Sequence, residues 1–224
     1  MKTATRRRAL TVEMTSGSLW KNILLFSLPL MMTQVLEVLF NLSDVAIAGK
    51  CWPAFQTQFG FVPCYVNSRL TGRGIPVSCE VDIWGTLSEY LGTVISQDAV
   101  TLLDINNTVP ADMYEGEIKG KYDYTHKDTF MGFHCGNTCS RKLAFCSMKN
   151  QMIMARSLPA EVTNGTLEGD IIPGDITFYR LQSTADSKLR AYIAQGEVLP
   201  VASHSFGSIG VFAIPEMGRF YAMC

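Results

Sequence analysis

The chain has 224 residues, 17% of them charged, and a formal net charge of −1. The Lys and Arg residues after position 50 are scattered and form no basic stripe, so we expect no nucleic-acid partner. The sequence contains no Walker loop, dinucleotide-binding fingerprint or G-x-S-x-G elbow, which removes the enzyme classes built on those motifs.

The first fifty residues combine a basic N-terminus with an apolar segment. Arginines at positions 6–8 precede an apolar stretch over residues 22–48, which Gln34, Glu37 and Asp44 interrupt. This length suffices to cross a bilayer, so we favour a transmembrane helix over residues 18–47, kinked near Pro29, and membrane association through residues 22–48. A secretory signal and a buried amphipathic helix stay open as alternatives.

Residues 51–97 predict mainly helices. Helix-like apolar spacing covers residues 54–70 and 84–96, and in the second of these Leu87, Tyr90, Leu91 and Val94 fall on one face. We therefore interpret residues 51–97 as the remnant of an α/β domain.

Residues 98–224 predict a β-rich domain with strands separated by Gly, Pro, Asn and Asp turns, such as Asn164-Gly165 and Pro173-Gly174. The fold class is therefore α+β: a hydrophobic N-terminal helix, a partial α/β domain and a C-terminal β domain. The predicted strands are Val100 to Leu103, Thr129 to Phe133, Asp175 to Leu181, Leu189 to Ala194 and Ile209 to Ile214.

Two acidic residues, Glu80 and Asp104, lie in apolar, strand-like surroundings near predicted strand ends. A carboxylate buried in such surroundings is normally paired, protonated or bound to a metal. Because hard divalent cations prefer carboxylate oxygens, the pair indicates a Mg²⁺ or Mn²⁺ site. The alternative is two solvated turn acids.

His134 follows an apolar triplet and precedes Gly136-Asn137, where a strand runs into a turn. Such a histidine is either a hydrogen-bonded structural residue or a ligand or substrate contact. The seven cysteines have irregular spacing, which favours reduced, mostly buried thiols over a zinc site.

The region from Cys51 to Tyr221 resembles the C-terminal part of the L-fucose isomerase family, metal-dependent sugar isomerases of the cytoplasm. Five blocks carry this resemblance, in a consistent order over about three quarters of the chain. The blocks are Cys51-Trp52-Pro53-Ala54-Phe55, Cys79-Glu80-Val81-Asp82, Leu103-Asp104-Ile105-Asn106-Asn107, Gly132-Phe133-His134-Cys135-Gly136-Asn137 and Phe212-Ala213-Ile214-Pro215-Glu216-Met217-Gly218.

The resemblance implies aldose–ketose isomerisation of a small sugar through a metal-bound cis-enediol. Glu80 and Asp104 match the family's Mn²⁺ ligands, which also serve as the acid/base pair, while His134 and Asn137 are expected to bind the substrate. Another divalent cation in place of Mn²⁺ and a homo-oligomeric state both stay open. For the fold, the resemblance implies an antiparallel, barrel-like C-terminal domain.

The sequence also departs from that family. The resemblance implies two α/β domains ahead of this region and a further histidine ligand beyond it, so we expect a truncated and impaired isomerase. Residues 12–50, including Ser16-Gly17-Ser18-Leu19-Trp20 and Asn41-Leu42-Ser43-Asp44, resemble the start of multidrug and toxic compound extrusion transporters. A chimera joined near Lys50/Cys51 is therefore expected, and the alternative function is a membrane-anchored or transporter-derived fragment with a non-catalytic soluble part.

Overall fold

The structure is a computed structural model that describes residues 46–51, 53–106, 108–215 and 217–221. The chain divides into two compact units, Met1–Asp44 and Val45–Cys224, and every described residue belongs to the second. The expected N-terminal helix therefore lies outside the described residues, apart from its end at Ile47. Ile47 belongs instead to a short strand, β1 (Ile47–Ala48), which pairs in parallel with β2 (Val77–Ser78).

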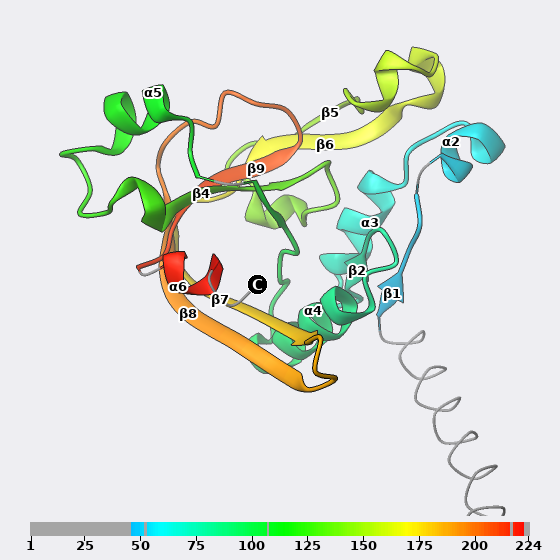
Figure 1. The fold of residues 1–224 in the computed structure, drawn as a ribbon. Helices are drawn as coiled ribbons and strands as arrows, with labels where there is room; N and C mark the ends of the chain where they lie inside the picture. Colours follow the sequence, from blue (N-terminus) through cyan, green and yellow to red (C-terminus); the bar gives the residue numbers. More distant parts are fainter. Residues whose placement is uncertain (1–45, 52, 107, 216, 222–224) are drawn as a thin grey trace, which may run out of the picture. The chain divides into compact units, whose positions relative to one another are not determined.

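Three helices follow β1 in the two regions, 54–70 and 84–96, where the apolar spacing predicted helix (Figure 1). They are α2 (Ala54–Phe59), α3 (Cys64–Thr71) and α4 (Ile83–Ser96). The region 54–70 is thus two helices, because Gly60 ends α2 in the left-handed conformation and Pro63 precedes α3. At the start of α4, the Asp82 side chain accepts a hydrogen bond from the Gly85 N–H at 2.8 Å.

The buried face of α4 differs from the predicted one. Gly85, Thr86, Ser88, Glu89 and Gly92 are buried, whereas the predicted apolar residues are half-buried or exposed; these are Leu87, Tyr90, Leu91 and Val94. The physical reason lies in strand β7 (Gly174–Ser183), which contacts the small and polar side of the helix through hydrogen bonds. Hydrophobic periodicity therefore identified the helix but not its contact face.

The main sheet of the described residues has seven strands, ordered β3-β4-β9-β6-β5, with β8 also pairing β9 and β7 pairing β8. Every pair is antiparallel except the parallel pair β6·β9. The strands not yet given are β3 (Asp104–Asn106), β4 (Thr129–His134), β5 (Ser147–Asn150), β6 (Asn164–Asp170), β8 (Leu189–Leu199) and β9 (Ser208–Ala213).

The strand predictions for β4, β7, β8 and β9 are confirmed within a few residues. One further strand prediction and one turn prediction are wrong. The run Val100 to Leu103 precedes β3 instead of forming a strand, and Asn164-Gly165 begins β6 instead of forming a turn. The sheet also forms no closed barrel among the described residues, because β3, β5 and β7 have no partner on their outer edges.

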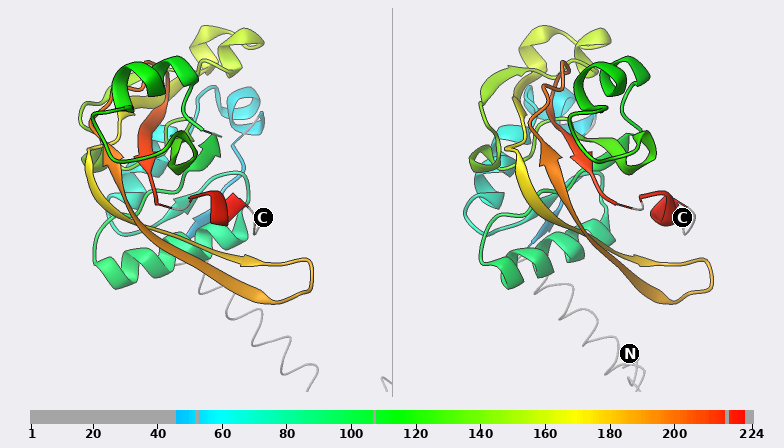
Figure 2. Two further views of the ribbon diagram at one scale, coloured as in Figure 1. Left: turned by 60° about the vertical axis from the view of Figure 1, so that its left-hand side comes forward. Right: turned by 90° about the vertical axis from the view of Figure 1, so that its left-hand side faces the viewer.

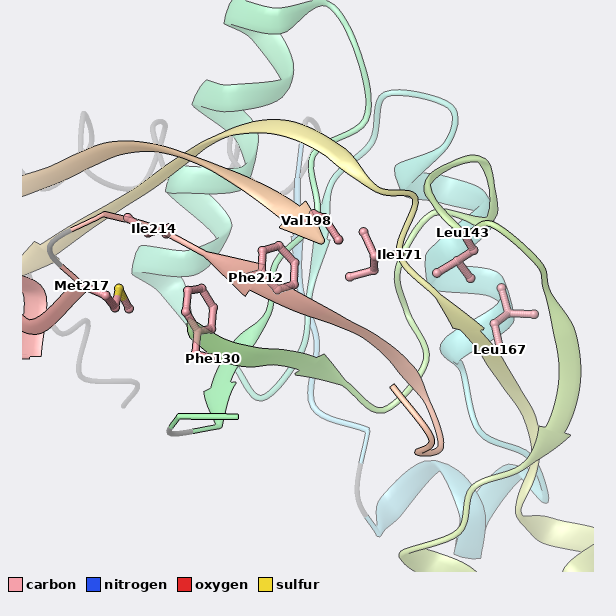
Figure 3. Packing of buried hydrophobic residues seen from close by; sticks show 8 residues of the cluster. All are labelled: Phe130, Leu143, Leu167, Ile171, Val198, Phe212, Ile214 and Met217. Atoms are coloured by element: carbon pink, nitrogen blue, oxygen red, sulfur yellow. The ribbon is translucent and has the colours of Figure 1, made fainter. Parts of the chain in front are cut away.

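Strand β9 is the centre of the sheet, and all six of its residues are buried. On one side of the sheet, the rings of Phe130 and Phe212 stack at 5.2 Å between centroids (Figure 3). Glycine at 132 makes this possible, since a Cβ there would lie 2.4 Å from the Phe212 ring. The remaining members of this core cluster are Leu143, Leu167, Ile171, Val198, Ile214 and Met217.

The other face of β4 and β9 carries a second core, in which Met131, Ile209 and Val211 pack against Ile118. Figure 2 shows the helical segment at residues 111–118 on this side of the strands. That segment is α5 (Ala111–Met113) continued by a π-helical turn at Tyr114–Ile118. The other short helices lie at His126–Asp128, Ser140–Lys142, Met154–Arg156, Ala160–Val162 and α6 (Met217–Tyr221).

Candidate functional site

Glu80 lies in the loop between β2 and α4, and its backbone is unusual. Glu80 and Val81 both have left-handed conformations, with φ of 64° and 59°. L-residues, and β-branched ones above all, rarely adopt this conformation, and such strain concentrates at functional sites. The Val81 N–H donates to the Gly49 carbonyl at 3.2 Å and the Asp82 N–H donates to the Cys79 carbonyl at 3.3 Å, so hydrogen bonds hold the loop in this shape.

Asp104 is the first residue of β3, directly opposite Phe133 of β4. Both Glu80 and Asp104 are exposed, so the expectation that these two carboxylates are buried is wrong. Neither side chain has a hydrogen bond or an ion pair with any described residue. Glu80 follows the end of β2, whereas Asp104 begins β3 instead of following a strand at Val100 to Leu103.

His134 ends β4 and is 5% exposed. Burial acts to lower its pKa, but the Cys135 thiol and the carboxylates of Asp104 and Glu80 raise it above its usual value. Each of the two acids therefore lies within electrostatic range of the histidine. Since neighbouring strand residues point to opposite faces, however, Asp104 starts on the face of Phe133 and not on that of His134.

Asn137 is buried in the turn after β4, 4% exposed. Its amide donates to the Val77 carbonyl at 3.1 Å and to the Cys79 sulfur at 3.4 Å. Both acceptors belong to the segment that leads to Glu80. The structure thus brings the predicted substrate-binding Asn137 next to the predicted metal ligand through the interior of the molecule.

The thiols near these residues are reduced. All six described cysteines are free, and only Cys146 is exposed, which confirms the prediction of mostly buried thiols. Thr166, itself buried, donates to the Cys135 carbonyl at 3.1 Å and to the Cys64 sulfur at 3.5 Å. Its bonding pattern repeats that of Asn137, with one carbonyl and one sulfur as acceptors.

Sequence reasoning missed a buried acid, Glu89 on α4. It is 3% exposed, and its Oε2 has no hydrogen-bond partner among the residues that the structure describes. Desolvation raises the pKa of Glu89 to about 8, so the side chain is largely neutral at pH 7. A helix position flanked by Ser88 and Tyr90 gives no signal of this burial, because the strand that covers it comes ninety residues later.

A cavity of about 820 Å³ opens beside β3, and its lining includes Asn106, Met131, Ser203 and His204. Asn106 lies two residues along β3 from Asp104 and opposite Met131. Residues at i and i+2 of a strand share a face, about 6.8 Å apart, so Asp104 points to the side of the sheet on which the cavity lies.

The described residues hold no cluster of three or more His, Cys, Asp or Glu side chains that could bind a metal ion. Glu80 and Asp104 supply suitable donor atoms, but they supply only two protein ligands. His134 does not complete the set in this geometry.

The C-terminal part of the chain is similar to a known protein family. Residues 132–224 match the family model described as the L-fucose isomerase C-terminal domain. His134 and Asn137 lie inside the matched residues, whereas Glu80 and Asp104 precede them.

Curated relatives extend the similarity. Sulfoquinovose isomerase of Alkalicoccus urumqiensis is 27% identical over 172 residues, which are 75% of this chain and 33% of that protein. Sulfoquinovose isomerase of Clostridium sp. (strain MSTE9) is 36% identical over 70 residues, 29% of this chain and 16% of that protein. The sulfoquinovose isomerase of Priestia megaterium is 41% identical over 46 residues, 20% of this chain and 10% of that protein. The chain thus spans a third or less of the length of these relatives.

These matches support an isomerase-like C-terminal part. They give no support to the transporter-like segment at residues 12–50 or to a junction at Lys50/Cys51. In the part of the chain that the structure describes, no helix is long and apolar enough to cross a membrane.

Proposed function

We propose that this chain carries the acid/base carboxylates of a divalent-metal-dependent aldose–ketose isomerase, with Glu80 and Asp104 as metal ligands. The observation that carries the proposal is the pair itself: two exposed carboxylates without hydrogen-bond or ion-pair partners among the described residues, each presented near a strand end. The similarity to sugar isomerases gives these carboxylates a reaction.

The donor set fits a hard cation in part. Mn²⁺ and Mg²⁺ bind through one or two carboxylates together with water and substrate oxygens, so two protein ligands are compatible with a working site. When bound, the ion would supply the positive charge that stabilises developing negative charge on a sugar oxygen.

The carboxylates would then move the proton. One of them takes the proton from C2 of the aldose, a hydrogen shifts from O2 to O1 through the cis-enediol, and the acid returns a proton to C1 to give the ketose. Glu80 and Asp104 approach the substrate from two different segments, and the cavity beside Asn106 offers room for the sugar carbons beyond C2. Direct contact of His134 with the sugar stays a prediction, since its side chain is buried and is 5% exposed.

Manganese binding tests the proposal without requiring activity. Free Mn²⁺ is titrated by electron paramagnetic resonance against the full chain and against Glu80→Gln and Asp104→Asn. We expect each substitution to weaken Mn²⁺ binding more than tenfold, because each removes one of two protein ligands. Glu161→Gln, which neutralises an exposed acid on a different element, is the control and should bind like the wild type.

The substrate part of the proposal has its own assay. The chain is incubated with Mn²⁺ and an aldose, and ketose formation is followed by NMR with exchange of the C2 proton into deuterated water. Wild-type chain that binds no Mn²⁺ would refute the proposed site. Unchanged binding in both carboxylate variants would refute it equally.

A further inference from the structure

Asn137 and Glu80 are 57 residues apart in the sequence, and the structure connects them through hydrogen bonds in the interior. The amide of Asn137 donates to the Val77 carbonyl and the Cys79 sulfur, one residue before Glu80. Because sulfur is a weak acceptor, the bond to Val77 is the stronger of the two. Together they anchor the end of β2 to the turn that follows β4.

The anchor acts on a backbone that needs support. Glu80 and Val81 are held with positive φ, and a strained pair of this kind persists only when its surroundings fix it. Backbone bonds from the Val81 N–H to the Gly49 carbonyl and from the Asp82 N–H to the Cys79 carbonyl also support it. In addition, the Ser78 hydroxyl donates to the Asp82 carbonyl at 3.3 Å, and the Asn67 amide donates to the Cys79 sulfur at 3.7 Å. Asn137 reaches this segment from the turn after β4, and Arg180 of β7 reaches it through the Asp82 carboxylate.

We propose that Asn137 is a positioning residue that fixes the backbone of residues 79–81 and so aims the Glu80 carboxylate; this rests on the proposed role of Glu80. A direct role in sugar binding fits the geometry less well, since Asn137 is buried and its donor nitrogen faces the protein interior. Asparagine suits the task because one short, rigid side chain reaches a carbonyl and a thiol at once.

The chain offers a matched control for this proposal. Thr166 is also buried and also donates to one backbone carbonyl and one cysteine sulfur, but its acceptors belong to Cys135 and Cys64. Asn137→Ala and Thr166→Val each remove a buried side-chain donor, although the Thr166 hydroxyl shares one hydrogen between its two acceptors and the Asn137 amide has two. Only the first removes a bond to the segment that precedes Glu80.

Amide hydrogen exchange on the full chain provides the first measurement. We expect Asn137→Ala to speed exchange at the Val81 and Asp82 amides about fivefold or more, and Thr166→Val to leave them nearly unchanged. Asn137→Ser, which keeps a shorter donor, should fall between these results and serves if the alanine variant does not fold. Equal effects of the Asn137 and Thr166 substitutions would overturn the proposal.

Mn²⁺ affinity provides the second measurement. Where a side chain only orients a metal ligand, its loss weakens metal binding about 10- to 100-fold, and we expect Asn137→Ala to fall in this range while Thr166→Val does not. Wild-type affinity in Asn137→Ala would overturn the positioning role while the metal site stands. If the wild type binds no Mn²⁺, the proposed function fails and the exchange rates at residues 81 and 82 alone decide whether Asn137 fixes the loop.

Discussion

Replacing Glu89 by Gln would remove the one acid that is buried among the described residues, and the fold opposes its ionisation. In the folded chain desolvation raises the pKa of Glu89 to about 8, from an ordinary value of 4.5. The folded state therefore retains a proton that the unfolded state releases, and rising pH favours unfolding. The stability contributed by this proton is fully present below pH 4.5 and is lost as the pH rises through 8.

The size of the effect follows from the same shift. Between pH 4.5 and 8 the free energy of unfolding should fall by about 1.4 kcal/mol per pH unit on account of Glu89, on the order of 5 kcal/mol in total. Glu89→Gln removes this dependence but buries amide hydrogens without partners, at a cost of about 1–3 kcal/mol at every pH. The wild type should be the more stable protein at pH 5, and the variant the more stable at pH 8.5.

Urea denaturation at pH 5, 7 and 8.5, followed by tryptophan fluorescence, to which Trp84 on the same helix contributes, measures the difference directly. Other titrating groups affect both proteins alike, so they cancel when the two are compared. Glu161→Gln, which removes an exposed acid, should track the wild type at each pH. A wild-type-to-variant difference that stays constant within about 0.5 kcal/mol across this range would refute the buried, neutral Glu89.

Substitutions at Gly92, Val81 and Asp82 test the surroundings of α4. Gly92→Ala places a Cβ 1.6 Å from the Tyr179 hydroxyl and should lower the free energy of unfolding by about 2 kcal/mol; Gly116→Ala, where a Cβ meets no atom within 4 Å, should change it little, and equal effects in thermal denaturation would contradict the close approach. Val81→Asn, which suits a positive φ, should raise stability by about 1 kcal/mol, and a loss in urea titration would speak against strain there. Asp82→Ala removes a helix cap and a half-exposed ion pair and should cost about 1–2 kcal/mol, whereas Asp82→Asn keeps the cap and should cost less than half as much in the same assay.

The elements that sequence patterns predicted well are those whose own residues decide their structure. Strand β4 is a run of β-prone residues that are almost all buried, and α4 has regular apolar spacing and an Asp82 cap. Strands β5 and β6 were missed because their residues, such as Lys149 and Glu168, are mostly polar. They form strands because they pair with each other and with β9.

In the candidate site, the carboxylates expected to be buried are exposed, and a different carboxylate is buried. The rule that a buried carboxylate must be paired, protonated or metal-bound was applied to Glu80 and Asp104, which are exposed. It applies to Glu89, which is buried and protonated. Burial of Glu89 depends on long-range packing against β7, and the donor role of Asn137 depends on contact with β2, so neither could be read from local spacing.

The contact between α4 and β7 also bears on the order in which the molecule opens. Asp82 accepts hydrogen bonds from both ends of the Arg180 guanidinium, at 2.7 and 3.1 Å, and the Tyr179 hydroxyl donates to the Ser88 carbonyl at 2.8 Å. A helix held by such bonds, with a small and polar inner face, gains little from apolar burial, so it belongs among the first segments to detach in partial unfolding. Glu80 lies shortly before the start of this helix, so its carboxylate should lose its fixed position before the β4–β9 core unfolds. Metal binding to Glu80 should in turn stabilise α4 against this partial unfolding.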